Sequence, residues 1–153
     1  MKVFLDIAAN PVHTWSMLLS SEIRHGRHCV FQLHVHLVFV AKYRGKIFDA
    51  DAVQRLRTIF EKVCMDFEGQ LVEMNGATDH IHLLIHYPPK HAVSTLVNSL
   101  KGVSSRLLRL ERPDLERRYW KNVLWSPSYF AASCGGPPIE ILKRYIEQQK
   151  IPM

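Results

Sequence analysis

The segment QLVEMNGATDHIHLLIHYPP, residues 70–89, predicts a β-hairpin around which the rest of the chain can be arranged. Two apolar-rich runs, QLVEM and HIHLLIHY, flank the turn-rich NGATD, a pattern typical of two antiparallel strands. Pro88 and Pro89 end the second strand, because proline cannot donate a hydrogen bond to a β-ladder. His80 and His82 are two residues apart in that strand, so their side chains share one face of the predicted sheet.

The sequence before the hairpin predicts one strand and one helix. The run CVFQLHVHLVFVA, residues 29–41, is rich in β-branched and aromatic residues and predicts a single long strand. Asp51 and Gln54 resemble a capping box, and apolar residues at helical spacing follow them as far as Gly69. An amphipathic helix is therefore expected between this strand and the hairpin.

The sequence after the hairpin predicts a second helix and a last strand. Apolar residues keep helical spacing from Val93 to Leu110, and Pro113 stops the helix. Residues 122–133 predict a strand, which Pro127 assigns to the edge of the sheet. The linker CGGPP then precedes a final helix, IEILKRYIEQQK, residues 139–150.

The order strand, helix, strand, strand, helix, strand predicts an α+β fold. Each amphipathic helix needs an apolar surface to cover, so we expect a four-stranded, mostly antiparallel sheet with two helices on one face. This arrangement is that of ferredoxin-like and RRM-like domains. The final helix is an addition to it.

Length and composition favour a single globular domain. The chain has 153 residues, and no apolar run approaches the roughly 20 residues that a membrane helix requires. Its three cysteines form no CxxC pair, and its first residues make a poor secretory signal, so we expect a cytoplasmic protein without membrane contact. The net charge of +6 suits nucleic-acid binding, although a charged run is more often a solvated face.

A second histidine pair makes the function ambiguous at this level. His34 and His36 repeat the spacing of His80 and His82, and each pair could be either a polar stripe or two ligands of a metal ion. A metal site requires at least one further ligand. In the final helix, Tyr145 and Gln149 are four residues apart and would project from one side.

The motifs DHIHLLI, LKGVSSRLL, LWSPSYFAAS and IEILKRYIEQQ, with HLVFVAKYR upstream, resemble those of the single-tyrosine HUH transposases of the smallest bacterial insertion sequences. The resemblance runs from about His28 to Gln149. It implies that His80, His82 and Gln149 bind a divalent metal, Mg²⁺ or Mn²⁺, and that Tyr145 is the catalytic nucleophile. His34 and His36 would then not belong to the metal site.

The same resemblance implies a transposase that cleaves and rejoins single-stranded DNA at insertion-sequence ends through a metal-assisted 5′-phosphotyrosine intermediate. Its substrate would be single-stranded DNA with hairpin ends, and its working form a homodimer. Residues 1–20 match nothing in the family pattern and are expected to be an atypical N-terminal extension. Residues 21–153 would form the transposase domain, with residues 138–150 as a mobile catalytic helix.

Position and charge suggest five DNA-binding residues, which are Lys42, Arg44, Lys101, Ser105 and Arg106. Four aromatic residues could stack on bases or could instead belong to the core or to a dimer interface: Trp120, Trp125, Tyr129 and Phe130.

Three other interpretations stay open. A two-histidine phosphoesterase is disfavoured because both triplets end in histidine rather than in threonine or serine. A non-catalytic nucleic-acid-binding module would use the same fold. A domesticated relative that processes hairpins would use the same chemistry.

Overall fold

The computed structural model describes residues 24–116, 123–133 and 146–148. In chain order its elements are β1 (Arg24–His25), β2 (Val30–Phe31), β3 (His34–Val40), the 3-10 helix η1 (Lys42–Arg44), α3 (Ala50–Asp66), β4 (Gln70–Gly76), β5 (His80–His86), α4 (Val93–Glu111), α5 (Pro113–Glu116) and β6 (Phe130–Ser133). Strands β3 to β6 form a four-stranded sheet in the order β4-β5-β3-β6. Every neighbouring pair in it is antiparallel.

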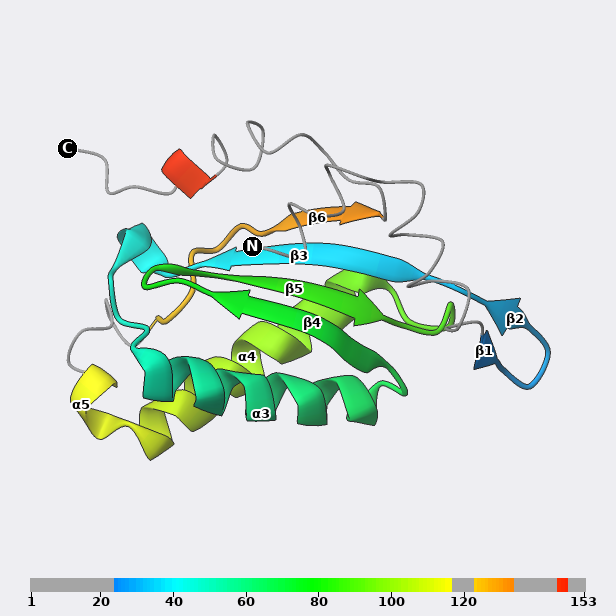
Figure 1. Ribbon diagram of the computed structural model, residues 1–153, viewed down its shortest axis with the longest axis horizontal. Coiled ribbons are helices and arrows are strands. Elements are labelled where there is room, and N and C mark those ends of the chain that lie inside the picture. The colour runs from blue at the N-terminus through cyan, green and yellow to red at the C-terminus, as the bar shows by residue number, and fades with distance from the viewer. Residues whose placement is uncertain (1–23, 117–122, 134–145, 149–153) are drawn as a thin grey trace.

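The predicted α+β fold is confirmed. Helices α3 and α4 lie along one face of the four-stranded sheet, and the strand order is that expected for the βαββαβ arrangement (Figure 1). Side chains alternate along a strand, so one set of β3 and β5 residues faces the helices and the other set faces away. Leu37, Phe39, Ile81 and Leu83 belong to the set that joins the helices in the main core.

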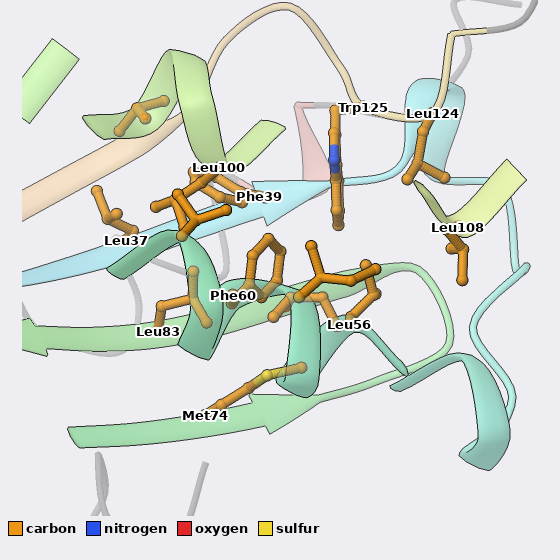
Figure 2. Close-up of a cluster of buried hydrophobic side chains, with 14 of the residues drawn as sticks. Leu37, Phe39, Leu56, Phe60, Met74, Leu83, Leu100, Leu108, Leu124 and Trp125 are labelled. Atoms are coloured by element: carbon orange, nitrogen blue, oxygen red, sulfur yellow. The ribbon is translucent and has the colours of Figure 1, made fainter. Parts of the chain in front are cut away.

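Trp125 lies at the centre of this core, between the sheet and the helices (Figure 2). Its ring centroid is 5.6 Å from that of Phe39 and 6.4 Å from that of Phe60. The indole Nε1–H donates a 2.9 Å hydrogen bond to Ser104 Oγ of α4, so the polar edge of the ring is satisfied inside the core. Trp125 is 4% exposed, which makes it a packing residue and not a surface for stacking bases.

Helix α3 begins differently from the prediction. Its N-cap is Asp49, whose side chain accepts a hydrogen bond from the backbone N–H of Ala52 at 2.8 Å. Asp51 is in the first turn and pairs with Arg55 and Arg112. The predicted capping box at Asp51 is therefore wrong, because the extended backbone that a cap requires occurs two residues earlier.

Arg112, the C-cap residue of α4, joins the ends of three helices. Its guanidinium contacts carboxylates of Asp49, Asp51 and Asp114 at 2.8, 2.7 and 2.9 Å. The C-terminal end of α4 is thereby held to the N-terminal ends of α3 and α5. Opposite helix dipole ends meet at this point, which favours the arrangement.

Two predicted strands differ in extent. The run predicted as one strand over residues 29–41 is divided, because Val30–Phe31 pairs with Arg24–His25 in a separate two-stranded sheet before β3 begins at His34. The last strand is shorter than predicted. Among the described residues 123–133, only Phe130–Ser133 forms a ladder, and Trp125 makes an isolated bridge to Ala41, so Pro127 lies outside the strand.

Residues 1–23 lie outside the described part of the chain, so the expected N-terminal extension stays a prediction. Of the expected final helix, the described residues are 146–148. Among the described helices, none has both the length and the apolar character required to cross a membrane.

Candidate metal and DNA-cleavage site

His80 and His82 lie on the face of the sheet opposite to α3 and α4. They stand across from Val40 and Val38 of β3 in the strand register. Their ring centroids are 4.9 Å apart and the ring planes are inclined by 79°. Two imidazoles from one strand are thus close enough to share a ligand, as the spacing predicted.

Asp79 holds the ring of His80 in one orientation. The His80 Nδ1 atom is 2.7 Å from Asp79 Oδ1, and Arg44 Nε–H donates to Asp79 Oδ2 at 2.9 Å. Burial would raise the pKa of Asp79, but the hydrogen bonds from His80 and Arg44 outweigh it and the pKa is lowered. Because a carboxylate only accepts hydrogen bonds, the proton lies on Nδ1 and the Nε2 lone pair of a neutral His80 is left for a ligand.

His82 is kept neutral by its surroundings. Burial and the charge of His80 lower its pKa to about 3. A metal ion binds neutral imidazole, so a low pKa keeps a ligand nitrogen available over the physiological pH range. The donor set therefore fits a divalent cation that accepts imidazole, to which it could supply two ligands.

The second histidine pair lies on the same face but towards the other end of the strands. His34 stacks on His86, with ring centroids 4.5 Å apart and ring planes inclined by 5°. His36 is buried, and burial followed by the charge of His34 lowers its pKa to about 4. Across residues 24–116, 123–133 and 146–148, no three histidine, cysteine, aspartate or glutamate side chains form a metal-binding group. A complete site thus needs a ligand of another type or from another part of the chain.

Two residues near the end of the chain, Ile146 and Glu147, lie beside the part of the sheet that carries His80 and His82. Ile146 packs with Val38 and Val40 of β3 in a small apolar cluster on the face away from the helices, with Phe130 at its edge. Glu147 Oε1 is 3.3 Å from Arg44 Nη1, the arginine that also contacts Asp79. The segment that follows Tyr145 in the sequence is therefore next to the strands that carry the histidines.

Tyr145 and Gln149 themselves lie outside the described residues. Their predicted roles as nucleophile and third metal ligand stay predictions. The described residues between them are 146–148.

Two of the predicted DNA-binding residues are already engaged inside the protein. Lys101 Nζ donates hydrogen bonds to the backbone carbonyls of Ser126 and Ser128 at 2.7 and 3.2 Å. Burial lowers the pKa of Lys101 to about 8. Arg44 contacts two carboxylates, as described above. Both side chains therefore have structural partners that the sequence does not reveal.

The other three candidates are distributed over two sides of the molecule. Lys42, in η1, has its ammonium 5.2 Å from the ring centroid of Tyr43. Ser105 and Arg106 are on α4, which packs on the opposite face of the sheet from His80 and His82. Ser105 is half-buried and Arg106 is exposed.

Sequence reasoning did not identify Asp79, Arg44 and Glu147 as a connected group. Asp79 could have been found, because an acidic residue directly before a ligating histidine is a frequent partner for its second nitrogen. Nothing in the sequence pairs Arg44 with Glu147, which is far along the chain.

Comparison with known proteins agrees with the fold. Residues 29–149 match the sequence profile of the family described as "Transposase IS200 like". The chain is 30% identical over 133 residues to the ISDra2 transposase TnpA of Deinococcus radiodurans. The alignment covers 87% of this chain and 95% of that protein. It is also 30% identical over 127 residues to the transposase for insertion sequence element IS200 of Salmonella typhimurium, covering 81% and 84%.

Two solved structures have a similar fold. The crystal structure of a Deinococcus radiodurans R1 protein described as a transposase has a TM-score of 0.78 and 28% identity, covering 85% of this chain and all of that one. A REP-associated tyrosine transposase bound to a REP hairpin has a TM-score of 0.52 at 14% identity, over 81% and 68% of the two chains, and shows likeness of fold alone. The chain belongs to the IS200-like transposase family.

Proposed function

We propose that this transposase cleaves and rejoins single-stranded DNA at insertion-sequence ends, with Tyr145 as the nucleophile and His80, His82 and Gln149 as ligands of Mg²⁺ or Mn²⁺. The observation that carries the proposal is the position of Ile146 and Glu147 beside β3 and Arg44. It brings the segment that follows Tyr145 to β3, the neighbour of the strand β5 that carries His80 and His82. Family membership supports the same assignment.

The proposed reaction is a transesterification. The Tyr145 phenol attacks the scissile phosphorus, a new bond forms between its oxygen and phosphorus, and the bond to the 3′-oxygen breaks. The phenolic proton is lost and the departing 3′-oxygen gains one, which leaves a 5′-phosphotyrosine and a free 3′-hydroxyl. When bound, the cation would polarise the phosphate and offset negative charge that develops in the transition state.

The residues of the chain have separate roles in this reaction. Asp79 binds His80 Nδ1, so that the Nε2 atom is the one that would hold the cation, and burial keeps His82 neutral. Reversal of the first step by the 3′-hydroxyl of another strand would rejoin DNA without an energy source, because the ester stores the bond energy. That outcome is strand transfer and not hydrolysis.

The substrate and the assembly are part of the proposal. We propose single-stranded DNA with hairpin ends as the partner, a homodimer as the working form and the cytoplasm as the location. A hairpin is the ligand of the REP-associated transposase that shares the fold, which supports a hairpin substrate here.

The test is formation of a covalent adduct between the protein and DNA. Labelled single-stranded DNA with element ends is incubated with the protein and Mn²⁺, and denaturant-resistant complexes are separated on a gel. We expect an adduct with the wild type that is lost in Tyr145→Phe and in His82→Ala. Gln149→Ala should raise the Mn²⁺ concentration required.

Two matched controls make the result specific. Tyr129→Phe removes a phenol from another part of the chain and should keep the adduct. His34→Ala removes a histidine from the pair outside the proposed site and should also keep it. An adduct that persists in Tyr145→Phe would reject the assigned nucleophile, and loss of it in Tyr129→Phe would point to the true one.

A further inference from the structure

Arg44 joins three segments that are far apart in the sequence. It ends η1, just after β3, and its Nε–H donates to Asp79 Oδ2 at 2.9 Å at the start of β5. Its Nη1 is 3.3 Å from Glu147 Oε1. Asp79 in turn binds His80 Nδ1 at 2.7 Å. A continuous chain of polar contacts thus leads from a proposed metal ligand to residues 146–148.

The backbone at this point is strained. Tyr43 and Arg44 have φ values of 58° and 55°, in the left-handed region that residues with a Cβ rarely adopt. Each such residue costs roughly 1–2 kcal/mol, so two in succession persist only where other contacts hold them. Backbone hydrogen bonds from Lys42 N to Leu124 O and from Arg44 N to Ala41 O, at 2.9 and 2.7 Å, do so. In this conformation the guanidinium contacts both Asp79 and Glu147.

The burial of the three side chains fits a structural role. The Asp79 side chain is 7% exposed, that of Arg44 is 21% exposed and that of Glu147 is 57% exposed. The contact with Asp79 is therefore fixed and largely shielded from water. The contact with Glu147 is at the surface, where an ion pair is weak and can open.

We infer that Arg44 is a positioning residue that couples the orientation of His80, through Asp79, to the placement of residues 146–148, through Glu147. The metal-binding half of this inference rests on the proposed function, because it takes His80 to be a ligand. The coupling needs the forked guanidinium, since one nitrogen serves Asp79 and another serves Glu147. A lysine would keep the positive charge but has a single nitrogen and cannot reproduce both contacts in this geometry.

The inference differs from a role in DNA binding, and the variant Arg44→Lys separates the two. Lysine also binds phosphate as a point charge, so a simple phosphate contact would largely survive the substitution. Loss of a bridge between two carboxylates would not be repaired by lysine. The measurements are therefore made without DNA.

Two readouts test the two halves of the inference. Mn²⁺ affinity, measured by calorimetry, reports the orientation of His80. Hydrogen exchange of peptides that span residues 146–148 reports their placement. We expect Arg44→Lys to weaken Mn²⁺ binding by about tenfold, the lower end of the effect of losing an outer-shell partner. It should also speed the exchange by about two- to fivefold, as expected for loss of a partly exposed ion pair.

Two further variants assign the effects. Glu147→Gln should speed the exchange as Arg44→Lys does but weaken Mn²⁺ binding less, because Asp79 still holds Arg44 and His80 while the segment before Gln149 loses its contact. Arg106→Lys, the same substitution on the far side of the sheet, should change neither.

Wild-type Mn²⁺ affinity and wild-type exchange in Arg44→Lys would overturn the inference while leaving the proposed function intact. A wild-type protein that binds no Mn²⁺ would instead reject the proposed metal site, and with it the His80 half of the coupling. Equal exchange in the wild type and Glu147→Gln would reject the other half.

Discussion

Lys101 is predicted to stabilise the fold, and Lys101→Met tests this role against direct DNA binding. Its ammonium donates to two backbone carbonyls and lies 5.9 Å from the ring centroids of both Phe39 and Tyr129. Hydrogen bonds from a charged donor contribute about 1.5 kcal/mol each at the lower end, or about 3 kcal/mol together. Methionine keeps the apolar stem but removes both.

Burial of the charge offsets part of this gain. The lowering of the Lys101 pKa from 10.5 to about 8 would correspond to about 3 kcal/mol for a fully buried group at 1.36 kcal/mol per pH unit. The side chain is only partly buried, so about half of that value applies. The expected net loss in Lys101→Met is about 1.5 kcal/mol at pH 7, or roughly 3–6 °C in melting temperature.

The loss should grow with pH. Because the folded-state pKa of Lys101 is below its unfolded value, folding penalises the charged form at pH values below about 8. The unfolded chain binds more protons than the folded one between pH 8 and 10.5, so wild-type stability rises there relative to Lys101→Met. We expect the difference to widen by about 1–2 kcal/mol across this range.

Urea unfolding at pH 7, 8, 9 and 10 measures the difference, and Lys62→Met on the exposed side of α3 is the matched control. The control should be nearly neutral at each pH, since Lys62 is 76% exposed. A Lys101→Met protein with wild-type stability but weaker single-stranded DNA binding would refute the structural role. A difference that stays constant from pH 8 to 10 would refute the lowered pKa.

Three further substitutions test the packing of the core and the N-terminal cap of α3. Trp125→Phe loses the hydrogen bond to Ser104 and part of a core ring, and should lower the free energy of unfolding by about 2 kcal/mol in urea denaturation. Gly76→Ala would bring a Cβ to 2.9 Å from Val53 Cγ1, so we expect a loss of about 1–3 kcal/mol that Val53→Ala in the same chain partly restores. Asp49→Ala removes the cap of α3, and thermal unfolding should show a loss of about 1–2 kcal/mol, whereas no change would mean that the cap is elsewhere.

The architecture could be predicted from the sequence because it depends on local pattern. Alternation in HIHLLIHY and helical spacing after Val93 are properties of contiguous residues, and both elements occur where they were expected. Residues 29–41 carry the same kind of pattern but are divided between two sheets. The division depends on pairing with Arg24–His25, which no feature of the run itself encodes.

The proximity of His80 and His82 could be predicted for the same reason. His80 and His82 share a face because of their spacing, and the structure brings their rings within 4.9 Å. The engagement of Lys101 by carbonyls near Ser126, and of Arg44 by Asp79 and Glu147, comes from tertiary contacts between distant segments. A basic residue in a sequence therefore looks like a DNA contact until its neighbours are known.

The ion pairs of Arg112 have a consequence for how the ends of the helices unfold. Because one guanidinium contacts the first turn of α3, the last turn of α4 and the beginning of α5, fraying of one end breaks contacts with the others, and we expect the three ends to open together. Amide protons in the last turn of α4 should therefore exchange together with those near the beginning of α3. The helical layer is thereby held together behind the face of the sheet on which we propose that DNA is cleaved.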